Sequence, residues 1–273
     1  MKWAFLLAAL LLQCSMPEKK ELSFEKGSYK YRIDVYGDSR DGENVFSSLM
    51  QLANTRVQSR QLFSIHLGDL ISRPQRQDQS IRYHQLIKTF VKDTPFLPVV
   101  GNHDVDSRES LESFRAAFPV IPETGYYAKK IEDVFFVGLN TTQTDLEGSI
   151  GSQQLLWLQE RLESPEAKES QVKIVAMHHP INGQGPVGQK LQELYTKHQV
   201  NFVFMGHIHA YKHWVVDKTH HIISGGGGSP IHGVFGDKGA FFHYVKLSRD
   251  ENGMGVEVID LFGEIREAFY VAI

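Results

Sequence analysis

The 273-residue chain has a single cysteine, Cys14. One cysteine cannot form a disulfide within the molecule, so a disulfide framework is excluded. A structural zinc site built from several thiolates is excluded for the same reason. The chain also lacks a large excess of either charge, since 29 basic residues stand against 32 acidic ones. This balance provides no broad cationic surface, so a nucleic-acid polymer is not indicated as a partner.

The amino terminus contains an apolar run that is too short to cross a bilayer. The run Trp3–Leu12 follows Lys2 and is succeeded by polar residues, a pattern typical of the apolar region of a signal peptide. The sequence Leu11–Ser15 resembles a bacterial lipoprotein cleavage box, in which the cysteine becomes the lipidated first residue of the mature protein. Gln13 stands where that box usually has a small residue.

These features predict an exported protein with one folded domain. We expect residues 1–14 to form a signal peptide, residues 15–29 an N-terminal linker and residues 30–273 the domain. Lipidation of Cys14 would give a bacterial membrane-anchored lipoprotein, whereas simple removal of the signal peptide would give a periplasmic or secreted protein. Membrane contact is expected only through this lipid.

The composition, with 41% hydrophobic residues, is that of an ordinary globular protein. Early apolar runs alternate with helical patterns and are nearly continuous, which indicates an α/β protein whose strands are buried on both faces. Later runs lie closer together and indicate a second sheet or an antiparallel extension. The expected strands are Tyr31–Tyr36, Leu62–Leu67, Phe96–Val100, Val134–Leu139, Val172–Met177, Phe202–Met205, His221–Ser224, Phe242–Leu247 and Val256–Phe262.

Three segments carry apolar residues at helical spacing, and we expect these residues to face the core. They are Val45, Leu49 and Leu52, then Ile81, Leu86 and Phe90, and finally Leu155, Leu158 and Leu162. Trp157 belongs to the last stripe and is expected to be a packing residue. The run Gly225–Gly228 follows a predicted strand and indicates a tight turn or a close backbone approach near the site.

Polar residues that can bind metal follow several predicted strands, at the edge where open α/β sheets place their ligand sites. Each motif by itself has an ordinary explanation, because such residues often serve in turns or on surfaces. Together they form a mixed oxygen and nitrogen set that suits Mn, Fe or Zn rather than Ca. The motifs are Gly37-Asp38-Ser39-Arg40, Gly68-Asp69, Gly101-Asn102-His103-Asp104, His178-His179-Pro180 and Gly206-His207-Ile208-His209.

The chemistry that needs such a set is the hydrolysis of phosphate esters. Anionic phosphate oxygens repel hydroxide, and two ions about 3.5–4 Å apart neutralise this charge and fix an in-line geometry. A carboxylate can bridge two ions, whereas a histidine donates to one. A central aspartate flanked by separate histidines is therefore expected.

In this order, the motifs resemble those of the calcineurin-like metallophosphoesterase superfamily, with some resemblance to its purple acid phosphatase branch. The match runs from Asp38 to His209 and on to Gly228. The resemblance implies an α/β (α+β) fold, a four-layer αββα sandwich of two mixed sheets flanked by helices. It also implies hydroxide activated by a dinuclear centre of Mn, Fe or Zn ions.

The resemblance implies six metal ligands: Asp38, Asp69, Asn102, His178, His207 and His209. Asp69 would bridge both ions, while Asn102, His178 and His207 would complete one site. The remaining two would belong to the other site. His103 would contact the substrate phosphate or donate a proton to the leaving group.

Two positions depart from the family pattern. Arg40 stands where many members have a second metal-binding histidine, and Ser72 stands where purple acid phosphatases have a tyrosine. Arginine does not bind metals, but its planar guanidinium matches phosphate oxygens. Arg40 is thus expected either to hold the substrate phosphate or to form a salt bridge with Asp41 or a neighbouring carboxylate. Arg73 is a weaker candidate for the phosphate contact.

Several histidines are not expected to bind metal. His179 is one of them, because the family's histidine lies two positions before the proline. Other histidines lie outside any motif and are expected to have an ordinary structural role; they include His66, His84, His213, His220, His221, His232 and His243. His232 stands out because it follows the glycine run.

The favoured function is hydrolysis of a phosphorylated small molecule, such as a nucleotide, by a phosphomonoesterase or phosphodiesterase. One alternative is a non-catalytic binding protein with an incomplete metal site, a reading that Arg40 motivates. The other is a protein serine/threonine phosphatase. Family resemblance does not decide among them, because members share ligands while their substrate loops differ.

Overall fold

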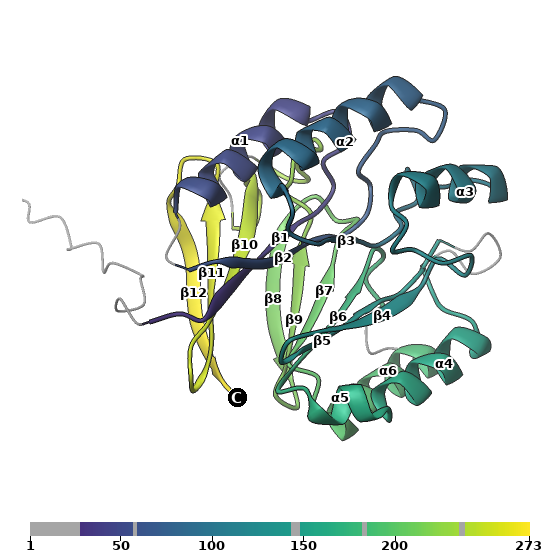
Figure 1. Cartoon of the computed structure of the whole chain (residues 1–273), viewed down its shortest axis with the longest axis vertical. Coiled ribbons are helices and arrows are strands. Elements are labelled where there is room, and N and C mark those ends of the chain that lie inside the picture. Colours follow the sequence, from purple (N-terminus) through teal and green to yellow (C-terminus); the bar gives the residue numbers. More distant parts are fainter. Residues whose placement is uncertain (1–27, 57–58, 143–147, 182–184, 235–237) are drawn as a thin grey trace, which may run out of the picture.

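The apolar runs of the sequence form most of the strands of two six-stranded sheets (Figure 1). The computed structural model describes residues 28–56, 59–142, 148–181, 185–234 and 238–273. The predicted signal peptide and Cys14 lie outside these ranges. Within them, no helix is long and apolar enough to span a membrane.

The first sheet joins a parallel unit to an antiparallel one. Its strands are β1 (Tyr31–Tyr36), β2 (Gln61–His66), β3 (Phe96–Pro98), β10 (His243–Arg249), β11 (Gly253–Asp260) and β12 (Ile265–Ala272). Their order is β12-β11-β10-β1-β2-β3. β1, β2 and β3 are parallel, whereas β10 is antiparallel to β1 and to β11. Of the late runs of the sequence, Phe242–Leu247 and Val256–Phe262 thus form the antiparallel extension as β10 and β11, whereas His221–Ser224 lies in a parallel strand of the second sheet.

The second sheet is built around four parallel strands. Its strands are β4 (Tyr127–Ile131), β5 (Val134–Gly138), β6 (Val172–Met177), β7 (Phe202–Met205), β8 (Tyr211–Val216) and β9 (Thr219–Ser224). Their order is β4-β5-β6-β7-β9-β8, with β5, β6, β7 and β9 parallel. The two outer strands run antiparallel to their neighbours.

Helices cover the outer face of each sheet. In Figure 1, α1 and α2 lie over the first sheet, while α4, α5 and α6 lie against the second. The helices are α1 (Glu43–Thr55), α2 (Gln77–Val91), α3 (Arg108–Ala117), α4 (Ser152–Leu162), α5 (Pro165–Glu169) and α6 (Gly185–Lys197). This arrangement confirms the four-layer αββα sandwich.

The main core lies between the two sheets. The fully buried side chains of Ile33 and Phe63 from the first sheet share one apolar cluster with Phe136 and Ile174 from the second, and the Phe63 and Phe136 rings meet edge to face at 6.2 Å. Each such side chain stabilises the fold by about 1.5–3 kcal/mol through removal of its surface from water. This burial holds the strand ends of both sheets in a fixed relation.

The helical stripes face the core with one correction. Leu49, Leu158 and Leu162 are buried as expected, and Trp157 packs on the ring of Tyr126 at 4.7 Å. Ile81, however, is 59% exposed.

The fully buried apolar residues of α2 are Tyr83, Ile87 and Val91. Leu86 and Phe90 of the expected stripe are partly buried and pack against the same core. Tyr83, Ile87 and Val91 follow the strict i, i+4, i+8 spacing of one helix face, whereas the expected stripe only approximated it.

Three strands were not predicted: β4, β8 and β12. Each one lies at an edge of its sheet, and most side chains in each are exposed or only partly buried. An edge strand does not need the continuous apolar run that marks a strand buried on both faces.

His243 provides a buried link between the sheets. Its Nδ1 donates to the carbonyl of Phe241 at 2.9 Å, and its Nε2 accepts from the Ser224 hydroxyl at 3.0 Å. Ser224 ends β9 and His243 begins β10, so the ring joins the second sheet to the first. Burial lowers the pKa of His243 to about 4, which keeps the imidazole neutral in the folded protein.

We therefore predict acid lability. In the unfolded chain His243 has the ordinary histidine pKa of about 6.5, whereas in the folded protein it becomes protonated only as the pH approaches 4. Its contribution to stability is complete above pH 6.5 and is lost as the pH falls toward 4, by up to about 1.4 kcal/mol per pH unit. Urea unfolding of the metal-free protein and of His243→Gln across this range should give a shallower pH slope for the variant. Equal slopes would contradict the assignment.

Candidate metal centre

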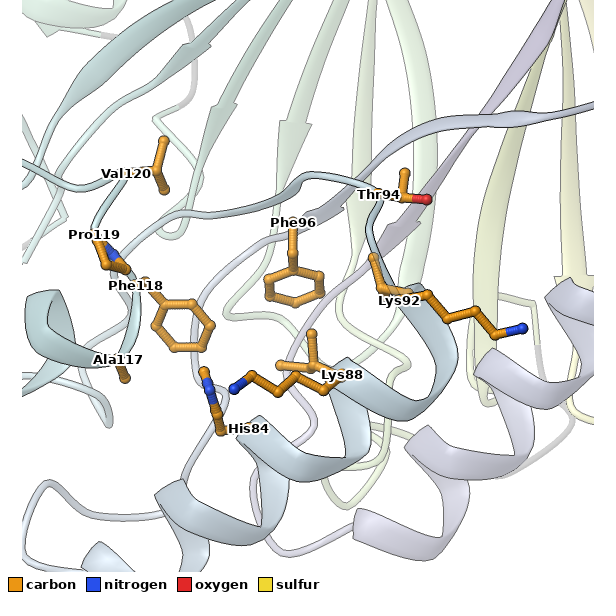
Figure 2. Close-up of a pocket in the computed structure, with 11 residues that line it drawn as sticks. His84, Lys88, Lys92, Thr94, Phe96, Ala117, Phe118, Pro119 and Val120 are labelled. Atoms are coloured by element: carbon orange, nitrogen blue, oxygen red, sulfur yellow. The ribbon is translucent and has the colours of Figure 1, made fainter.

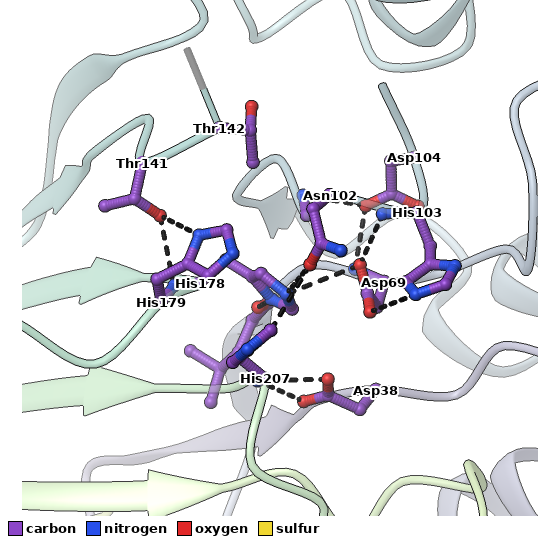
Figure 3. Close-up of polar contacts among 12 residues, drawn as sticks. Asp38, Asp69, Asn102, His103, Asp104, Thr141, Thr142, His178, His179 and His207 are labelled. Atoms are coloured by element: carbon purple, nitrogen blue, oxygen red, sulfur yellow. Dashed lines mark hydrogen bonds and ion pairs between the residues drawn. The ribbon is translucent and has the colours of Figure 1, made fainter. Parts of the chain in front are cut away.

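The predicted ligands come together where the parallel strands of both sheets end (Figure 3). Asp38 and Asp69 follow β1 and β2, and Asn102 follows β3. His178 and His207 come from the second sheet, after β6 and β7. Strand ends from two sheets thus supply one cluster of side chains, as the motif order implied.

The backbone is strained at several of these residues. Asp38, Arg40, Asp69 and His207 have φ angles of 59°, 37°, 55° and 66°, in the left-handed region that side chains usually avoid. Hydrogen bonds hold these turns, including Asp38 N–H to Gly68 C=O at 3.1 Å and Arg40 N–H to Asp69 C=O at 3.1 Å. Strain of this kind persists when the surroundings over-determine it and is concentrated at functional sites.

Two glycine positions allow the strand ends to approach closely. A Cβ at Gly101 would lie 2.1 Å from the Asp69 nitrogen, so only glycine fits. In the glycine run, Gly227 N–H donates to Gly37 C=O at 2.7 Å, and Ser229 N–H donates to Asp38 C=O at 2.7 Å. The run Gly225–Gly228 is therefore a close backbone approach beside the site, as predicted.

Asp104, the last residue of the Gly-Asn-His-Asp motif, holds the Asp69 loop and is not among the predicted ligands. Its buried carboxylate accepts from the backbone N–H groups of Asp69 at 2.8 Å, Ile71 at 3.2 Å and Gly101 at 2.9 Å. Burial and the nearby Asp69 raise the pKa of Asp104 to about 8. Its two oxygens are already used by the backbone, so it acts as a positioning residue.

Three histidines are fixed in the tautomer that suits a metal ligand. The Nδ1 atoms of His103, His178 and His209 lie 2.8, 2.8 and 2.7 Å from the carbonyl oxygens of Ser72, Leu67 and Pro230. A carbonyl oxygen only accepts, so each Nδ1 must carry the proton. Each Nε2 is left with its lone pair, the arrangement that backbone carbonyls impose on metal-binding histidines.

The Nε2 atoms point at the buried carboxylates. His178 Nε2 lies 2.9 Å from Asn102 Oδ1 and 3.4 Å from Asp69 Oδ1. His209 Nε2 lies 3.6 Å from Asp38 Oδ1, and His103 Nε2 lies 4.0 Å from Asp69 Oδ2. The arrangement forms two neighbouring donor sets that share the region around Asp69.

His207 adds another link between the sets. Its backbone N–H donates to both oxygens of Asp38 at 3.0 Å, and its Nδ1 lies 3.3 Å from Asn102 Oδ1. One donor atom from each of Asp38, Asp69 and His178 lies within 4.8 Å of the others, and the same holds for His178, His179 and His207. Oxygen and nitrogen donors at this spacing fit transition-metal ions.

The electrostatics of the centre favour a bound cation. Burial and the neighbouring Asp69 raise the pKa of Asp38 well above its usual range, and burial raises that of Asp69. Burial also lowers the pKa of His178 to about 3 and that of His209 to about 4. Carboxylates buried beside neutral imidazoles lose the stabilisation of their charged form by water, and a bound metal ion would stabilise that form.

Arg40 belongs to this centre. Its charge lowers the pKa of both Asp38 and Asp69, and its Nε is buried without a hydrogen-bond partner. Within the described ranges Arg40 forms no ion pair with Asp41, whose carboxylate instead accepts from the Gln79 side chain at 3.3 Å. The contacts therefore do not favour the alternative of an Arg40–Asp41 pair.

Other expected positions lie apart. Arg73 is exposed, and Ser72 contributes its carbonyl to His103. The unassigned histidines outside this region mostly bond to neighbouring side chains, as His66 does to the Ser39 hydroxyl at 3.1 Å.

Two histidines that the sequence analysis left without a functional role lie at the site. The His179 ring lies 4.4 Å from that of His207, and the His232 ring stacks on that of His209 at 4.3 Å. His232 Nδ1 also accepts from His209 N–H at 3.2 Å. The position of His232 after the glycine run was the only sequence signal for it.

A separate pocket between α2 and the end of α3 is not a comparable site. Its volume is about 230 Å³, and Ile87, Phe96 and Phe118 form much of its lining. In Figure 2 the Lys88 amine points toward His84, whereas Lys92 extends away from the pocket. Its polar groups do not converge on one point, so it provides no chemistry like that of the metal centre.

Comparison with known proteins agrees with this geometry. A family model for the calcineurin-like phosphoesterase domain matches residues 31–211. Serine/threonine-protein phosphatase CPPED1 of Mus musculus is 25% identical over 195 residues, which cover 64% of this chain and 62% of the mouse protein. Purple acid phosphatase 21 of Arabidopsis thaliana is 27% identical over 214 residues, which cover 70% of this chain and 47% of that protein. The matches thus span about half to three fifths of these relatives.

The fold also has solved counterparts. The structure of purple acid phosphatase PPD1 from yellow lupin (Lupinus luteus) seeds superimposes with a TM-score of 0.73 at 18% identity, and the match covers 91% of this chain and 55% of that one. At this identity the likeness establishes the fold. With the family model spanning most of the folded region and the motif residues gathered in one centre, the chain belongs to the calcineurin-like phosphoesterase family.

Proposed function

We propose that this protein hydrolyses phosphate esters at a centre of two metal ions. The observation that carries the proposal is the set of imidazoles whose Nδ1 protons are fixed by backbone carbonyls, so that the Nε2 lone pairs point at two buried aspartates. Burying two carboxylates removes the water that stabilises their charge, and bound cations would replace that stabilisation. Phosphatase names among the relatives give independent support for a hydrolase.

The residues divide between the two ions by position. Asp69 lies between the donor sets and would contact both ions. Asn102, His178 and His207 would complete one site, and Asp38 and His209 would belong to the other. The bound ions, of Mn, Fe or Zn, would polarise the phosphate and supply hydroxide at neutral pH.

Arg40 and His103 would contact the substrate itself. The partly buried guanidinium of Arg40 lies close enough to Asp38 and Asp69 to lower the pKa of both, and its planar shape matches two phosphate oxygens. His103 holds its Nδ1 proton toward Ser72 and presents Nε2 near Asp69. From this position it can contact the phosphate or, when protonated, donate a proton to the leaving-group oxygen.

The substrate that we propose is a phosphorylated small molecule, such as a nucleotide. Both monoesters and diesters fit the proposed chemistry. We further propose that the protein acts after export, either as a lipoprotein anchored through Cys14 or as a periplasmic or secreted protein. The apolar run Trp3–Leu12 and the Leu11–Ser15 box support this location.

A protein phosphatase is the second candidate, because the mouse relative carries that name. Hydrolysis of a phosphopeptide without hydrolysis of small esters would favour it. A non-catalytic binding protein is the third reading, motivated by arginine at position 40. Metal binding without turnover of either substrate type would favour this third reading.

The first prediction concerns Asp69. Asp69→Asn removes the carboxylate that contacts both ions, so kcat/KM for p-nitrophenyl phosphate and its bis-ester should fall by more than the roughly 100-fold typical of losing an outer-shell partner. Asparagine tolerates the left-handed backbone at this position. Assays would compare metal-stripped protein with protein resupplied with Mn, Fe or Zn.

Asp217→Asn is the matched control, because Asp217 is exposed and also has a positive φ, 46°. It should retain wild-type activity. An Asp69→Asn variant as active as this control would refute the central role of Asp69.

The second prediction concerns Arg40. Arg40→Gln should raise KM for the phosphate ester by about tenfold or more, as expected for losing a hydrogen bond to a charged group, while two metal ions per chain remain bound. Arg40→Lys should recover only part of the loss, because a lysine lacks the planar pair of donors. Arg73→Gln, at an exposed position, should change KM little.

The Arg40→His variant distinguishes two hypotheses for position 40. In one, Arg40 contacts the substrate phosphate at a complete two-metal site; in the other, arginine leaves one metal site incomplete. If the natural site binds two ions, added histidine should not be needed for activity. Turnover that appears only in Arg40→His would show that one metal site is incomplete and would favour the binding-protein alternative.

A further inference from the structure

His179 lies in the metal centre yet is held differently from its neighbours. Its ring is 4.8 Å from that of His178 and 4.4 Å from that of His207. A ring nitrogen of each of these three histidines lies within 4.8 Å of the other two. By position alone, His179 is a candidate for a third imidazole ligand.

The hydroxyl of Thr141 fixes the orientation of His179. Thr141 Oγ1 accepts from the backbone N–H of His179 at 3.0 Å and lies 3.0 Å from its Nδ1. In the part of the chain that the structure describes, Nδ1 is the only hydrogen-bond partner of this hydroxyl that can accept its proton. The hydroxyl therefore donates to Nδ1, and the neutral ring carries its proton on Nε2.

Thr141 is itself rigidly placed. The residue is fully buried and follows β5. The preceding residue, Asn140, is locked by the side chain of Gln154, which accepts from the Asn140 N–H at 2.8 Å and donates to its C=O at 2.7 Å. Figure 3 shows Thr141 on one side of the His179 ring, with the remainder of the site on the other.

The tautomer of His179 is thus opposite to that of His178 and His209. Those two rings donate Nδ1–H to backbone carbonyls and direct a lone pair into the centre. His179 accepts at Nδ1 and has an N–H at Nε2. An N–H cannot bind a metal ion, but it can donate a hydrogen bond to an anionic oxygen.

We propose that His179, oriented by Thr141, donates a hydrogen bond to an oxygen of the substrate phosphate and is not a metal ligand. This role rests on the proposed hydrolysis of phosphate esters. It divides the adjacent histidines of the His178-His179-Pro180 motif into a metal ligand and a phosphate contact. Thr141 is the positioning residue for this contact.

The tautomer can be measured without metal or substrate. Nitrogen-15 shifts of histidine-labelled, metal-free protein at pH 8 should show His179 protonated at Nε2 and His178 protonated at Nδ1. Thr141→Val should reduce the Nε2–H preference of His179. Thr219→Val is the matched control, because Thr219 is a buried threonine that donates to Val200 C=O at 3.0 Å, in β9 and away from the ring. A wild-type His179 protonated at Nδ1 would overturn the proposal.

The contact with phosphate is tested by calorimetry on Mn-loaded protein. His179→Ala should weaken binding of inorganic phosphate about tenfold or more, with Mn affinity and stoichiometry unchanged. His179→Gln should recover most of the binding, because its amide can donate from a similar position. Loss of a Mn ion in His179→Ala would show that His179 is a metal ligand. Unchanged phosphate binding would show that His179 does not contact the phosphate. Either result would contradict the proposal. Absence of Mn binding in the wild type would contradict the proposed function itself.

Discussion

The structure depends on holding two carboxylates, those of Asp38 and Asp69, buried close together. Both are almost completely inaccessible, and burial raises the pKa of each. Desolvated like charges at this spacing oppose folding unless hydrogen bonds or positive charge compensate. The surrounding features of the fold provide the compensation in part: backbone N–H groups of His103 and His207 donate to the two carboxylates, and the Arg40 charge lies nearby.

The architecture explains how this cluster is held. The apolar layer between the sheets fixes where the parallel strands end, and the turns that follow adopt left-handed φ angles at Asp38, Asp69 and His207. Asp104 secures one of these turns through backbone N–H groups, and the Gly225–Gly228 run closes over another. Stability from the hydrophobic core therefore offsets local strain and desolvation at the site. A bound metal pair would remove the remaining electrostatic cost, which couples stability to metal binding.

Sequence patterns predicted the features that depend on short-range order. Strands buried on both faces, such as β6 and β7, have nearly continuous apolar runs and were placed with their observed bounds, as was β1, whose apolar residues alternate with Arg32 and Asp34. Edge strands such as β8 and β12 lack such runs, because many of their side chains are exposed to solvent and do not need to be apolar. The ligand motifs could likewise be read, because each lies directly after a strand.

Roles that depend on contacts between distant segments could not be predicted. The bond from Thr141 to His179 joins residues 38 positions apart, and the stacking of His232 on His209 requires the glycine run to fold back. The tautomers of His178 and His209 depend on the carbonyls of Leu67 and Pro230, whose positions follow only from the packed sheets. Neither spacing nor composition contains that information.

The most direct test of the account is a crystal structure of the Mn-soaked protein, with anomalous scattering measured at the Mn absorption edge. The account predicts two peaks in each molecule. One should lie among Asp69, Asn102, His178 and His207, and the other among Asp38, Asp69 and His209. A single peak, or none at this cluster, would contradict a dinuclear centre.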